Sequence, residues 1–175
     1  MGISELISGF LQPVFDLLPR MSARPADNEW GIVDSWFSGV RQFSGPVLHV
    51  PVVTHVEYIP KCEIPIDTGL QTLTTADRKT VAVNATAIVR VVDPVFLRAN
   101  VEVDRWEEWA AMRVRGCVQE VVTGHNWSYV LDKGESFIEE LAYGELYAFG
   151  IEVERLVLED ICETFSLRLM NPYGA

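Results

Sequence analysis

The stretch that decides the fold of this chain reads VAVNATAIVRVVDP, from Val81 to Pro94. Small and β-branched side chains alternate with others along it, so that one face carries Val81, Val83, Ala85, Ala87, Val89 and Val91. A two-residue period is typical of a half-buried strand. Asp93-Pro94 ends the pattern because proline has no N–H to donate to a neighbouring strand. The stretch therefore predicts one long strand near the centre of a sheet.

The residues before this strand favour extended structure. Val52–Pro60 is β-branched and flanked by prolines, and with Gly45–Pro51 it forms one strand or two strands broken at Pro51. The polar run Thr74–Lys79 then predicts the turn of a hairpin that leads into the long strand.

After Asp93-Pro94 the apolar period changes from two to that of a helix. A helix is expected from Val103 to Val122 and is capped by Gly124, with the inward stripe Val103, Trp106, Ala110, Val114, Cys117, Val118 and Val121. After a connector at residues 126–131, a second helix is expected from Gly134 or Glu135 to Phe149, with Ile138, Leu141, Ala142, Leu146 and Phe149 facing inward. Ile151–Ile161 alternates as a last strand. The order predicts an α+β fold in which two helices cover one face of a mostly antiparallel sheet.

Several short motifs occur in a distinctive order along this framework. They are Glu29-Trp30-Gly31-Ile32-Val33, Gly45-Pro46 with Pro51, Thr75 with Asp77, Asp93-Pro94, and Gly150-Ile151-Glu152-Val153. In this order they resemble the stomatin, prohibitin and flotillin (SPFH, or band-seven) family, although Gly-Pro stands where the family commonly has Pro-Gly. The resemblance implies an SPFH-like domain over residues 23–165, between an amino-terminal helix at residues 1–22 and a tail at residues 166–175.

The amino terminus carries an apolar stripe at helical spacing, made of Ile3, Leu6, Ile7, Phe10, Leu11, Val14, Phe15, Leu17 and Leu18. Glu5 and Asp16 interrupt it, so it predicts an amphipathic helix and not a spanning one, and Pro13 should kink it. The family resemblance implies a shallow membrane anchor here. The alternative is a helix packed against protein, which the lack of lysine in the segment favours.

Charge and cysteine content exclude several classes of protein. The chain has 14 Lys and Arg against 25 Asp and Glu, a net charge of −11. Such a surface repels nucleic-acid phosphates, so we expect no nucleic-acid partner. Cys62, Cys117 and Cys162 form no Cys-x-x-Cys pair, which argues against a metal site or a disulfide framework and favours the reducing cytoplasm or the cytoplasmic face of a membrane.

The sequence offers no convincing catalytic site and indicates no cofactor. It contains no P-loop, nucleophile elbow or His-Glu-x-x-His. His49 and His55 lack a nearby third ligand, and His125 and Ser128 are merely close in sequence. The acidic residues of the last strand are expected to form a solvated face, because cation sites draw oxygens from a tight loop.

These expectations favour a non-enzymatic, self-associating scaffold, peripheral on a membrane or organising a protein assembly. Trp106, Trp109 and Met112 are the candidate residues for an oligomer interface, because Trp109 and Met112 lie off the inward stripe of their helix. Relatives usually continue into a long coiled coil, and no sustained heptad follows the last strand here. The alternative is a structural component of a virus particle, such as a phage virion protein, in which the same helix packs into a neighbouring subunit.

Overall fold

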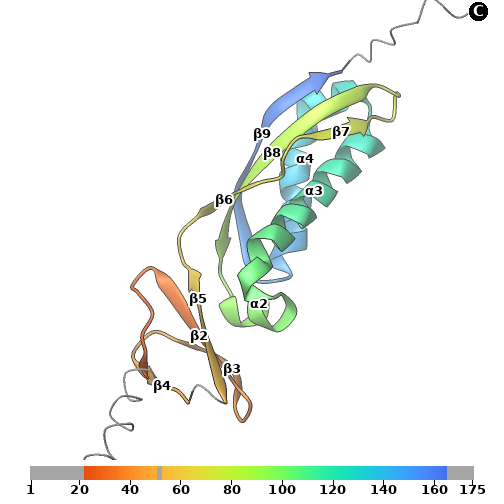
Figure 1. The fold of residues 1–175 in the computed structure, drawn as a ribbon. Coiled ribbons are helices and arrows are strands. Elements are labelled where there is room, and N and C mark those ends of the chain that lie inside the picture. Colours follow the sequence, from red (N-terminus) through yellow and green to blue (C-terminus); the bar gives the residue numbers. More distant parts are fainter. Residues whose placement is uncertain (1–21, 51–52, 165–175) are drawn as a thin grey trace, which may run out of the picture. The chain divides into compact units, whose positions relative to one another are not determined.

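The computed structural model describes residues 22–50 and 53–164 (Figure 1). The chain forms two compact units. The first contains the residues up to Glu63 together with Arg90–Trp106 and Phe149–Ile151, and the second contains Ile64–Val89, Glu107–Ala148 and the residues from Glu152 on. The expected amino-terminal helix lies, apart from Ser22, outside the described residues.

Short antiparallel strands build most of the first unit. Strand β2 (Glu29–Ser35) lies between β3 (Gly39–Phe43) and β5 (Thr54–Pro60), and β1 (Ser22–Ala23) pairs with β4 (Val47–Leu48). Of the two interpretations of the Pro51 region, the one with separate strands is correct. Gly31 of β2 pairs with Phe43 of β3, and a Cβ on Gly31 would lie 2.6 Å from that ring. Glycine therefore lets the aromatic ring cover the strand.

A helix that the sequence analysis missed follows the long strand. Helix α2 (Pro94–Asn100) begins with Pro at its first turn, and the Asp93 carboxylate accepts a hydrogen bond from the Phe96 N–H at 2.9 Å. Both features are ordinary helix-start signals. Arg98 of α2 forms an ion pair with Glu57 at 2.7 Å and approaches Asp34 at 3.6 Å, which ties the helix to β5 and β2. A 3-10 turn, η2 (Val103–Arg105), follows.

Two of the family-like motifs meet in this unit. Gly150 adopts φ +80°, and its carbonyl accepts hydrogen bonds from the N–H groups of Val92 and Asp93 at 2.9 and 3.1 Å. A Cβ at Gly150 would lie 2.4 Å from the Asp93 carbonyl oxygen. The Gly-Ile-x-Val and Asp-Pro motifs are therefore two sides of one close backbone contact.

The second unit is centred on β8 (Thr80–Val91), which is the long strand predicted from the sequence. Strands β6 (Ile64–Asp67) and β7 (Gln71–Thr74) pair antiparallel with successive halves of one edge of β8, and β9 (Ile151–Glu163) pairs with its other edge. The predicted alternation is confirmed, because the six residues placed on one face of β8 are all buried: Val81, Val83, Ala85, Ala87, Val89 and Val91.

A β-bulge separates β6 from β7. The residues Thr68–Leu70 stand opposite two residues of β8, and Gly69 takes φ +69°. The buried Thr68 hydroxyl accepts a hydrogen bond from the Ala85 N–H at 3.1 Å, which replaces a ladder bond lost in the bulge. The Arg115 guanidinium donates to the Thr68 carbonyl, with its Nε at 3.0 Å. The Arg115 side chain thus provides a hydrogen-bond partner for a backbone carbonyl within the bulge.

Helices α3 (Trp106–Gly124) and α4 (Trp127–Tyr147) lie on the same side of this sheet, so the predicted α+β arrangement is confirmed (Figure 1). The predicted stripe of α3 is buried, including Ala110, Val114 and Val118. The helix ends at Gly124, where the sequence placed its cap, and the φ of this glycine is not positive.

Helix α4 starts at Trp127, seven residues before Gly134, the earlier of the two predicted starts, so that prediction was wrong. Gly134 does not break the helix; it is buried, and a Cβ there would lie 3.2 Å from Val130. The true start is fixed from another part of the chain, because the Asp77 carboxylate accepts a hydrogen bond from the Trp127 N–H at 3.0 Å. At the other end, Ile138, Ala142 and Leu146 are buried as predicted, whereas Leu141 is half-buried and Phe149 follows the helix.

The Thr75-Asp77 motif is therefore a structural joint between the β7–β8 turn and α4. Thr75 is buried, and its hydroxyl donates to Asp77 Oδ1 at 2.5 Å and accepts from the Lys79 N–H at 3.1 Å. The Ala76 N–H donates to the His125 carbonyl at 3.0 Å. The pKa of Asp77 is lowered, mainly by the hydrogen bond from Thr75 and to a smaller extent by the hydrogen bond from the Trp127 N–H.

Strand β9 departs from simple alternation. Glu154 and Arg155 are both exposed, so the buried side moves from Ile151 and Val153 to Leu156. On its outer edge, the N–H groups of Leu156 and Leu158 donate to the carboxylates of Glu139 and Glu135 at 3.2 and 3.3 Å. These glutamates, four residues apart on α4, occupy backbone N–H groups of β9 that could otherwise pair with another strand.

Candidate interaction surfaces

The residues considered for chemistry have structural neighbours in this fold. The His125 ring stacks on Tyr129 at 4.4 Å between centroids, and its Nδ1 lies 3.0 Å from the Val121 carbonyl. His55 lies 3.1 Å from the Glu57 carboxylate, which Arg98 also binds. Within the described part of the chain, no group of three or more His, Cys, Asp or Glu side chains is arranged to hold a metal ion.

The acidic side chains of β9 have hydrogen-bond partners of their own. The Glu159 carboxylate accepts from Thr86 at 2.8 Å and from the Asn84 amide at 3.3 Å. Glu163 pairs with Lys79 at 3.2 Å. Their lone pairs are thus partly engaged within the sheet, in keeping with a structural role for this face.

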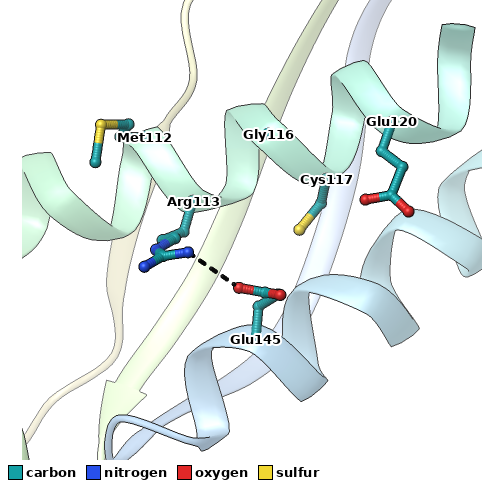
Figure 2. Close-up of a pocket in the computed structure, with 6 residues that line it drawn as sticks. All are labelled: Met112, Arg113, Gly116, Cys117, Glu120 and Glu145. Atoms are coloured by element: carbon teal, nitrogen blue, oxygen red, sulfur yellow. Dashed lines mark hydrogen bonds and ion pairs between the residues drawn. The ribbon is translucent and has the colours of Figure 1, made fainter.

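An open groove of about 330 Å³ lies between α3 and α4 (Figure 2). The residues that line it are Met112, Arg113, Gly116, Cys117, Glu120 and Glu145. Arg113 and Glu145 bridge the two helices at 3.4 Å, and the Arg113 guanidinium also lies 5.1 Å from the centroid of the Trp109 ring. The groove therefore has the exposed Met112 at its edge and an ion pair, Arg113–Glu145, between its two helices.

The thiol in this groove is suited to packing and not to nucleophilic chemistry. Burial first, and then the nearby carboxylates of Glu145 and Glu120, raise the pKa of Cys117 to about 11. A thiol becomes a nucleophile as its thiolate, which needs a lowered pKa and an electropositive neighbourhood. Cys117 is therefore protonated at neutral pH.

The three candidate interface residues have different surroundings. Trp106 is 4% exposed and belongs to the chain's own core, Trp109 is half-buried beneath Arg113, and Met112 is 60% exposed on the rim of the groove. A second hollow of about 340 Å³ adjoins the first at Glu145, and Phe137, Leu141 and Gly144 of α4 line it. The outer surface of the two helices thus carries partly exposed apolar side chains, of which the sequence analysis had identified Met112.

The other proposed contact residues lie outside the described structure. They are the stripe Ile3, Leu6, Ile7, Phe10, Leu11, Val14, Phe15, Leu17 and Leu18, and its role in contact with membrane or partner stays a prediction.

The sequence analysis overlooked the most exposed apolar side chains of the described structure. Trp36 and Phe37, in the turn between β2 and β3, are 88% and 87% exposed. A signal was present in the sequence, since Trp36-Phe37-Ser38-Gly39 puts two aromatic residues directly before the Ser-Gly of a turn.

Comparison with protein families agrees with the architecture and the motif order. The family described as SPFH domain / Band 7 matches residues 26–165. The chain therefore belongs to the SPFH (band-seven) family. No curated protein sequence matches the chain. In the two described stretches, no helix combines the length and the apolarity needed to cross a bilayer.

Proposed function

We propose that this chain is a non-enzymatic scaffold that self-associates and lies peripherally on a membrane, where it organises a protein assembly. Membership of the SPFH family supports the scaffold role and membrane association, which are general features of the family. The amphipathic stripe predicted at residues 1–20 supports a shallow anchor without a spanning segment.

The observation that carries self-association is the outer surface of α3 and α4. Met112, Phe137 and Leu141 place apolar side chains around two adjoining hollows, and the Arg113–Glu145 ion pair lies between the two helices. Methionine, aromatic residues and arginine are enriched at interfaces between subunits. Trp109 and Met112 thus remain interface candidates, whereas Trp106 supports the interface only from within the core.

The cytoplasmic face of a membrane is the location that this proposal favours. The three cysteines are free, Cys62 and Cys162 are exposed, and reduced cysteines persist in reducing compartments. The net charge of −11 disfavours attachment through anionic lipid, so the anchor should act through apolar contact.

Sedimentation of the full chain and its flotation with phosphatidylcholine vesicles test the two parts together. Met112→Glu with Leu141→Glu should lower the oligomer mass, because it places two charges in the proposed interface. Leu131→Glu, at another exposed apolar position of α4, should leave the mass unchanged. Leu6→Glu with Phe10→Glu should abolish flotation.

A monomeric wild-type chain would contradict self-association, and a wild type that does not float would contradict the membrane part. A large symmetric particle that forms without lipid would instead favour the alternative of a virion component.

A further inference from the structure

The turn between β2 and β3 has a geometry that directs two aromatic side chains outward. Ser35 pairs with Gly39 across a three-residue connection, the Ser38 N–H donates to the Ser35 carbonyl at 3.2 Å, and Gly39 takes φ +68°. This is a tight turn closed by a left-handed glycine, one of the common hairpin connections. Trp36 and Phe37 occupy its two corners.

The fold itself does not explain aromatic residues at these corners. Turn corners normally carry Pro, Gly, Asn, Asp or Ser, which satisfy the backbone or its dihedral angles. Trp36 and Phe37 are 88% and 87% exposed, so their rings add little to the core. The backbone of the turn is held by two hydrogen bonds: the Trp36 N–H donates to the Val53 carbonyl at 3.2 Å, and the Phe37 N–H to Ser35 Oγ at 3.3 Å. The aromatic tip, defined as Trp36 and Phe37, is thus presented on a fixed backbone.

The residues around the tip lack negative charge, in contrast to the chain as a whole. Between Ser35 and Arg41 the only ionisable side chain is that of Arg41, and between His49 and His55 no carboxylate occurs. Val53 and Thr54 lie beside the tip, because Thr54 pairs with Ser35 and the Val53 carbonyl accepts from the Trp36 N–H. The nearest acid along the chain, Asp34, lies 3.6 Å from Arg98. In a chain of net charge −11, the aromatic tip therefore lies in a segment, Ser35–Val40, that carries no ionisable side chain.

We infer that the aromatic tip inserts into the interfacial region of a lipid bilayer. Two aromatic side chains can bury about 300–500 Å² together. A specific protein partner needs roughly 800 Å² from each side, which a two-residue projection does not supply. A bilayer accepts a small convex projection, and Trp and Phe are the side chains that favour its interfacial region.

This inference rests on the proposed membrane association and adds a second contact point to it. The amphipathic stripe precedes Ser22, and Ser22 pairs with Leu48 in the same unit that holds the tip. A membrane contact through both would fix the orientation of the first unit on the bilayer, whereas the stripe alone would leave it free to rotate.

Partition of the full chain into zwitterionic phosphatidylcholine vesicles tests the inference. Trp36→Ser with Phe37→Ser should lower the partition coefficient about 10- to 100-fold, because it removes two large apolar contacts with the interface. Trp36→Phe should retain most of the binding. A matched control, Leu131→Ser with Tyr147→Ser, removes two exposed apolar side chains from α4 and should leave partition unchanged.

Three results separate the tip from the proposed function. A tip variant that keeps its melting temperature but loses partition supports the inference. A tip variant that partitions as the wild type does overturns it and leaves membrane association standing, and a change in oligomer mass without a change in partition likewise overturns it by marking a contact between proteins. A wild type that binds no vesicles overturns the inference together with the membrane part of the proposed function.

Discussion

Two hairpin turns in this chain differ in composition and in what their side chains contact. The turn between β7 and β8 is polar, and its Thr75 and Asp77 bind each other and the start of α4. The turn between β2 and β3 is aromatic, and Trp36 and Phe37 are almost fully exposed. Both connect adjacent antiparallel strands, so turn geometry alone does not separate them. The difference is what each turn contacts: the first is hydrogen-bonded to the start of α4, and the aromatic side chains of the second face solvent.

The largest expected effect comes from comparing two left-handed glycines. Gly150 faces the Asp93 carbonyl, whereas nothing lies within 4 Å of a Cβ built on Gly39 of the aromatic turn. Gly150→Ala should cost about 3 kcal/mol, the sum of left-handed strain and a clash with the backbone. Gly39→Ala should cost about 1 kcal/mol, because only the strain applies. Urea unfolding measures both, and equal costs would contradict the close contact at Gly150.

A smaller effect is expected from the hydroxyl groups of the two turns. Thr75→Val should cost about 2 kcal/mol, because the buried Thr75 hydroxyl binds both Asp77 and the Lys79 N–H. Ser35→Ala removes the hydroxyl that accepts from the Phe37 N–H in the exposed turn, and it should change the free energy of unfolding by less than about 0.5 kcal/mol. Urea unfolding would refute the comparison if Ser35→Ala were the more destabilising.

The smallest effect is a pH dependence that the two turns should not share. The folded-state pKa of Asp77 is lowered by Thr75 and by the Trp127 N–H, so the stability that its charge contributes is present above its unfolded pKa of about 3.9. That contribution is lost as the pH falls through the folded pKa. The melting temperature of Asp77→Asn should therefore lie below that of the wild type at pH 7, and the gap should narrow below about pH 4.

The aromatic turn provides the control for this titration. The residues from Ser35 to Val40 carry no ionisable side chain, so any difference in melting temperature between Trp36→Ser with Phe37→Ser and the wild type should not vary over the same pH range. A gap for Asp77→Asn that stays constant from pH 7 to pH 3 would mean that its charge does not stabilise the start of α4.

Local pattern was a good guide wherever a residue's neighbours in sequence also decide its environment. The inward face of β8 and the stripe of α3 follow periods of two and of 3.6, and burial on one side enforces each period. Helix α2 carried equally local signals in Asp93 and Pro94, but the same two residues also end the preceding strand, and only that end was predicted from them.

The errors occurred where distant residues decide the structure. Gly134 has low helix propensity, yet α4 runs through it because Asp77, fifty residues before Trp127, fixes the helix start seven residues before Gly134. The bulge at Gly69 depends on Thr68 and on Arg115, which lies on another element. For the candidate surfaces, the sequence marked Met112 as lying off the inward stripe, but it did not rank Trp36 and Phe37 as exposed.

The sequence by itself determined the class of fold, the central strand, the course of α3 and the family, because each depends on periodicity or on motif order along the chain. Only the tertiary structure decided why those motifs exist: Gly150 meets Asp93, and Asp77 caps α4. It alone showed that Trp36 and Phe37 face solvent. The physical reason is that hydrogen bonding and burial are relations between residues far apart in the chain, and local pattern does not contain them.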